Sequence, residues 1–79
     1  MATSLSVGDP VVWLYVPRGG YGYAVSVAAV VERIGPALVQ VRIAVRHPIS
    51  GVWHQECRWV QPRHLSLRTL RVPQVDDPH

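Results

Sequence analysis

The sequence predicts a single small all-β domain, and three features of the chain indicate this class. With 79 residues, the chain can enclose one hydrophobic core but cannot hold a nucleotide-binding α/β domain or a two-domain enzyme. Its apolar segments are rich in valine and aromatic residues and are separated by glycine and proline, as in strands joined by turns. Residues 38–46 also alternate between apolar and mainly polar side chains. We therefore expect five short strands that curl into one small barrel.

The elements follow one another with clear boundaries. The first expected strand covers residues 11–16, and the loop after it is kept irregular by Gly19, Gly20 and Gly22. The longest expected strand covers residues 24–34 and ends at a tight turn, in which Pro36 presets the backbone. The remaining strands are expected at residues 38–46, 52–60 and 65–70, with a short helical turn at 61–64 before the last strand.

Alternation also predicts how neighbouring strands pair. In residues 38–46 the odd positions are apolar and the even positions are mainly polar, so the odd positions should face the core. Pairing Ile34 with Leu38 across the turn puts Val31 on the same inner face. In the next hairpin, pairing Arg46 with Val52 sets Arg42 opposite Glu56 on the outer face. The same pairing places three side chains of the last long strand in the core: Trp53, Cys57 and Trp59.

Two regions do not fit one simple alternation. Residues 11–16 are apolar on both faces, so either positions 11, 13 and 15 or positions 12, 14 and 16 face outward. Residues 71–79 contain two prolines and two aspartates. We therefore predict a barrel over residues 1–70 and a flexible C-terminal tail over 71–79.

Short motifs give the predicted barrel a family resemblance. The pattern begins with Gly-Asp-x-Val at residues 8–11. It continues through a long first loop and a three-strand meander, and it ends with Val-x-Pro-x-x-Leu at residues 60–65. This pattern, over residues 7–70, resembles the SH3-like small barrels, which include KOW, Tudor and bacterial SH3-type modules. The resemblance implies a five-stranded barrel that binds its ligand through the first loop. Such barrels include nucleic-acid binders, peptide binders and oligomeric enzymes.

Composition narrows the function classes. The net charge is +3, all eight basic residues are arginine, and residues 33–71 hold seven of them against one Glu, which favours an anionic partner. No apolar run approaches the ~20 residues of a membrane span, and no secretory signal is visible. The single cysteine, Cys57, cannot form an internal disulfide, which is typical of the cytoplasm. We expect a cytoplasmic protein without membrane contact.

The candidate contact residues fall into two groups. Arginine and tyrosine can stack on bases, and arginine also binds phosphate, so we expect the first loop and a basic outer face to contact nucleic acid. Structural alternatives are that the tyrosines cap the barrel and that the arginines form a solvated face. The candidates are Arg18, Tyr21 and Tyr23 in the loop, and Arg42, Arg46 and Arg58 on the sheet.

Metal binding and catalysis are not expected. His54 and Cys57 are three residues apart on one strand and should point to opposite faces, so no metal or cofactor site is predicted. Cys57 should be a buried, inert thiol. Plasmid-type dihydrofolate reductases are SH3-like barrels of similar length, but residues 39–42 read Val-Gln-Val-Arg and lack the tyrosine of their Val-Gln-x-Tyr signature. We predict that the chain is not an enzyme.

The predicted function is therefore a noncatalytic binding module that contacts nucleic acid. The alternative is a self-associating protein-interaction module without nucleic-acid binding. A homodimer is expected in either case, because a barrel has one interior while several outward positions are small or apolar. These outward positions are Ala24, Ser26, Ala28, Val30 and Ala44.

Overall fold

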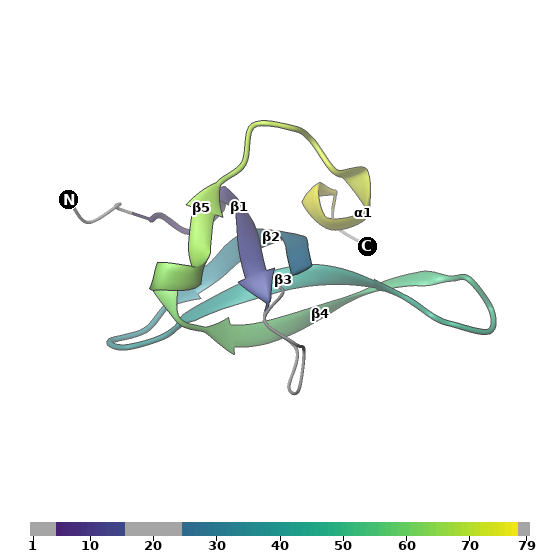
Figure 1. Cartoon of the computed structure of the whole chain (residues 1–79), viewed down its shortest axis with the longest axis horizontal. Helices are drawn as coiled ribbons and strands as arrows, with labels where there is room; N and C mark the ends of the chain where they lie inside the picture. Colours follow the sequence, from purple (N-terminus) through teal and green to yellow (C-terminus); the bar gives the residue numbers. More distant parts are fainter. Residues whose placement is uncertain (1–4, 16–24, 78–79) are drawn as a thin grey trace.

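The computed structural model describes residues 5–15 and 25–77, which form one antiparallel five-stranded sheet in the order β4-β3-β2-β1-β5 (Figure 1). The predicted all-β class, the five strands and the helical turn before the last strand are confirmed. Strands β4 and β5 are the two edges, and the described residues do not close the sheet into the predicted barrel. The strands are β1 (Pro10–Tyr15), β2 (Val25–Ile34), β3 (Val39–Arg46), β4 (Trp53–Val60) and β5 (Leu65–Leu67), with the 3-10 helix η1 (Pro62–His64) and the helix α1 (Pro73–Asp76).

The core lies on one face of the sheet, as the alternation predicts. Val11 and Val41 are fully buried, and Trp13 packs against the core cluster from β1. This answers the open question about the first strand, because positions 11 and 13 face inward while Leu14 is exposed. The buried cluster consists of Val11, Ala29, Val31, Val39, Val41, Ile43 and Val60.

The predicted register between β2 and β3 is correct in the middle of the hairpin and wrong at its end. Val31 lies opposite Val41, as predicted. Beyond that pair the register shifts, so Arg33 lies opposite Gln40 and Ile34 lies opposite Val39 rather than Leu38. One extra residue in β2, a β-bulge, causes the shift.

The predicted register between β3 and β4 is wrong by one residue. The backbone N–H of His47 donates to the carbonyl of Val52 at 2.9 Å, which closes the connecting loop so that Arg46 pairs with Trp53. Arg42 consequently lies opposite Cys57 rather than Glu56. Directly opposite residues share a face in an antiparallel pair. The side chains expected in the core, Trp53, Cys57 and Trp59, therefore lie on the outer face.

The C-terminal segment covers part of this outer face (Figure 1). Helix α1 packs on β2, β3 and β4, and its Val75 is fully buried. The Nε of Arg42 donates to the Val75 carbonyl at 3.0 Å, and the Gln55 amide donates to the Asp77 carbonyl at 2.7 Å. The described part of the predicted tail therefore packs on the sheet, and Val30, which was expected on the outer surface, is buried.

None of the helices in residues 5–15 and 25–77 is long and apolar enough to span a membrane. The final strand is shorter than predicted and ends at Leu67. It pairs with β1, where Val11 lies opposite Leu67.

Candidate functional site

Three polar or aromatic side chains form a row across the outer face of the sheet. Arg33 on β2 lies opposite Gln40 on β3, and Gln40 lies opposite Trp59 on β4. Trp59 is 50% exposed although it belongs to a strand. We call Arg33, Gln40 and Trp59 the outer row. It combines a positive charge, an amide and an aromatic ring on neighbouring strands.

The bulge in β2 gives Arg33 its place in this row. Side chains alternate between the two faces of a strand, so an unbroken β2 would point Arg33 to the inner face with Val31. The shift between Val31 and Arg33 instead pairs Arg33 with Gln40 on the outer face. Bulges often re-aim a side chain in this way. The intervening Glu32 forms an ion pair with Arg42.

The turn after β2 leaves room for the Trp59 ring. A Cβ atom added at Gly35 would lie 3.2 Å from a ring carbon of Trp59 and 2.9 Å from the Leu38 carbonyl oxygen. Real Cβ atoms essentially never approach as closely as the second distance. A glycine at this position therefore lets the indole lie against the turn.

The ion pairs of the described residues show which arginines are already neutralised. Among the described residues, three arginines have no carboxylate partner: Arg33, Arg46 and Arg63. Of these, Arg46 extends along its own hairpin loop, since a Cβ at Gly51 would lie 3.2 Å from its Nη2 atom. Two unpaired arginines therefore lie in a row with an exposed indole: Arg46 is directly opposite Trp53, and Arg33 is in line with Trp59 through Gln40. The neutralised pairs are Arg42–Glu32, Arg58–Glu56, Arg68–Asp76 and Arg71–Asp77.

The predicted basic face is not formed as expected. Arg42 is bound to Glu32 and to carbonyls of α1, and Arg46 lies on the same outer face as Arg42. Arg58 lies opposite Val41 and therefore on the inner face, so the three predicted sheet arginines do not share one surface. The predicted loop contacts Arg18, Tyr21 and Tyr23 lie outside the described residues.

Arg58 belongs to a charged cluster on the inner side of β4. His54 Nε2 lies 2.9 Å from Glu56 Oε1, and Arg58 forms an ion pair with the other Glu56 oxygen. The hydrogen bond to His54, and after it the charge and hydrogen bond of Arg58, lower the pKa of Glu56. These side chains satisfy one another on the edge strand.

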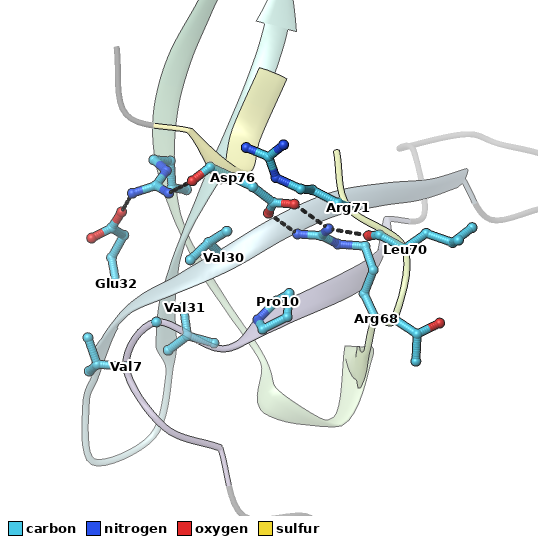
Figure 2. Close-up of a pocket in the computed structure, with 12 residues that line it drawn as sticks. Val7, Pro10, Val30, Val31, Glu32, Arg68, Leu70, Arg71 and Asp76 are labelled. Atoms are coloured by element: carbon cyan, nitrogen blue, oxygen red, sulfur yellow. Dashed lines mark hydrogen bonds and ion pairs between the residues drawn. The ribbon is translucent and has the colours of Figure 1, made fainter. Parts of the chain in front are cut away.

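A groove of about 450 Å³ lies between β1, β2 and the C-terminal segment (Figure 2). Its charged side chains are already paired, and the Arg68 side chain is only 6% exposed. Arg68 donates to the carbonyls of Val11 at 3.1 Å and Ala29 at 3.0 Å. Its hydrogen bonds to Asp76 hold the pKa of that carboxyl down to about 2. The side chains that line the groove therefore hold α1 against the sheet.

A second groove, of about 440 Å³, lies on the inner side of the sheet. Trp13 and Tyr15 form one wall, with ring centroids 5.1 Å apart, and Val27 and Val45 contribute apolar surface. Two arginines line it as well: Arg58 is already paired with Glu56, and Arg46 has no carboxylate partner among the described residues. This groove therefore combines apolar contact with one unpaired guanidinium.

No group of three or more His, Cys, Asp or Glu side chains that could hold a metal occurs in residues 5–15 and 25–77. Cys57 is exposed on the outer face, so the prediction of a buried thiol is wrong. The one-residue shift between β3 and β4 is the cause.

Neither Trp59 nor Arg33 is among the site residues predicted from the sequence. The predicted register between β3 and β4, which was wrong by one residue, assigned Trp59 to the core. Nothing in the alternation of β2 indicates the bulge. The one signal for Trp59 was Gly35, a turn residue whose missing side chain leaves space beside the ring.

Comparison with known proteins identifies the family. No protein-family model matches the chain, and no solved structure matches it. The chain is 47% identical over 64 residues to Protein KleD of Escherichia coli, an alignment that covers 81% of this chain and 94% of KleD. The chain therefore belongs to the KleD family.

Proposed function

We propose that this protein is a noncatalytic nucleic-acid-binding module and that the outer row contacts a single strand. The observation that carries the proposal is the half-exposed Trp59 indole opposite Gln40, which in turn lies opposite the unpaired Arg33. An exposed indole stacks on an unpaired base, a guanidinium binds phosphate, and an amide can hydrogen-bond a base edge. The net charge of +3 favours the same partner.

Single strands suit this surface better than duplexes. Stacking on an aromatic side chain requires a base whose face is free, which a duplex does not offer without unstacking. The outer row spans three neighbouring strands, about 4.8 Å apart, so two strand spacings separate Arg33 from Trp59. This separation suits a base on Trp59 and a nearby phosphate on Arg33.

The proposed architecture is an SH3-like module. Its support is the three-strand meander β2-β3-β4, followed by η1 and by β5, which returns to pair with β1. These are the elements on which the resemblance rests. Such modules bind through the loop between the first two strands, so Arg18, Tyr21 and Tyr23 are proposed to extend the contact.

The proposal is tested by titrating the full chain into a fluorescently labelled single-stranded oligonucleotide at low salt. Trp59→Ala should weaken binding about tenfold or more, since stacking on one aromatic residue is worth about 1–3 kcal/mol per base. Trp53→Ala compares the second exposed indole of β4: Trp53 lies on the same strand and face and is 43% exposed, but it lies opposite the unpaired Arg46 at the far end of the strand, outside the outer row. Equal losses in the two variants, with unchanged melting temperatures, would refute the assignment of Trp59.

A further inference from the structure

The edge strand β4 presents an unpaired backbone. It is eight residues long and stands at the end of the sheet order. Among the described residues, β3 is the only strand that pairs with it. A long free edge is a template for pairing with another chain, whereas the opposite edge, β5, has three residues.

The direction of the free backbone groups follows from the hairpin loop. The N–H of His47 donates to the Val52 carbonyl, so these two residues form a hydrogen-bonded pair. Hydrogen-bonded and non-bonded pairs alternate along an antiparallel ladder. The backbone groups of Glu56 and Arg58 therefore point to β3, and those of Cys57 point to the free edge.

A second copy of this chain fits that edge. Two β4 strands related by a twofold axis perpendicular to the sheet run antiparallel and keep the same faces together. The charges select the register. Centring the axis on Glu56 would oppose two Glu56 side chains, and centring it on Arg58 would oppose two arginines. Centring it on Cys57 instead sets each Glu56 opposite Arg58 of the other copy.

We propose that the protein forms a dimer in which the β4 strands of two copies pair edge to edge around Cys57. The pairing spans residues 54–60 and makes one continuous ten-stranded sheet from the two five-stranded sheets. It contains two Glu56–Arg58 pairs between the copies. Trp59 of the outer row lies within this span, but the dimer is tested without nucleic acid, so its failure is distinguishable from failure of the proposed function.

Charge exchange between copies gives the decisive experiment. Glu56→Arg alone and Arg58→Glu alone each place like charges across the interface, so each variant should dimerise much more weakly than the wild-type chain. An equimolar mixture of the two variants restores both opposite-charge pairs and should form a heterodimer. Arg63→Glu, a charge reversal in η1 outside β4, is the control and should dimerise like the wild-type chain.

The measurement is light scattering in reducing buffer from about 1 µM to 1 mM, a range that covers weak association. The wild-type mass should rise from 8.8 kDa toward twice that value as the concentration increases. A wild-type mass that stays at 8.8 kDa throughout would overturn the proposal. A mixture of the two variants that associates no better than each variant alone would overturn it as well.

Cys57 supplies a second test that needs no charged variant. The two Cys57 residues would form a hydrogen-bonded pair with Cα atoms about 5.5 Å apart, which lies within the range for a disulfide. Diamide, which oxidises two thiols to a disulfide, should link the folded wild-type chains faster than chains unfolded in urea. If the folded chains are linked no faster than chains unfolded in urea, the proposed register is contradicted.

Discussion

Arg68 donates hydrogen bonds to both carboxylate oxygens of Asp76, at 2.5 Å from Nη2 to Oδ1 and at 2.9 Å from Nη1 to Oδ2 (Figure 2). The same guanidinium donates to the carbonyls of Val11 and Ala29. One side chain from the end of the sheet thus joins β1 and β2 to the helix that covers the outer face. Asp76 also accepts from the Val72 backbone N–H at 2.7 Å, at the start of α1.

Replacing Arg68 should destabilise the protein strongly. Arg68→Met keeps the apolar stem but leaves Asp76 without its charge partner in a largely buried site. Breaking a buried pair by removing one member costs about 3–5 kcal/mol. Arg71→Gln breaks the exposed Arg71–Asp77 pair and should cost less than about 1 kcal/mol. Urea denaturation of both variants checks this prediction. Similar losses of unfolding free energy would contradict the role of Arg68 in holding α1 on the sheet.

Stability should also fall in acid because of Asp76. Its pKa is about 2 in the folded protein against an ordinary value of 3.8, so the unfolded chain binds the proton more readily. This contribution, on the order of 2 kcal/mol, is complete above about pH 4 and is lost as the pH falls toward 2. Asp76→Asn removes the titrating group. The difference in unfolding free energy between wild type and Asp76→Asn should shrink across this window, and a constant difference would contradict the assignment.

The sequence predicts the core well where burial distinguishes the two faces of a strand. The inward side chains of β3 follow from alternation, and the pairing of Val31 with Val41 follows from alternation together with the position of the turn after β2. The bulge that turns Arg33 outward does not, because an extra residue leaves no mark in the hydrophobic pattern of β2. This part of the candidate site required the three-dimensional register.

The edge strand shows why the rest could not be predicted. In β4 the more apolar alternation, with Trp53 and Trp59, faces outward, and His54, Glu56 and Arg58 face inward. Val60 is the one buried residue of β4, so neither face of the strand is strongly buried and apolarity does not identify the interior. A shift of one residue exchanges all side chains between the faces.

The C-terminal segment is a similar case. Its composition is polar, yet Val75 is fully buried on the sheet because Arg42 and Gln55 bind the carbonyls around α1. These contacts join residues 33 and 22 positions apart, and no local pattern in residues 71–77 indicates them.

The salt dependence of single-strand binding tests the central claim, that unpaired charge beside Trp59 holds a nucleic-acid strand. Binding constants of the full chain are measured at several salt concentrations for wild type, Arg33→Gln and Arg71→Gln. Each phosphate contact to a single strand contributes about 0.7 to the slope of log K against log salt. Arg33→Gln should lower the slope by about that amount, and Arg71→Gln should not, because Asp77 already neutralises Arg71. Absence of binding at low salt, or a slope that Arg33→Gln leaves unchanged, would contradict the account.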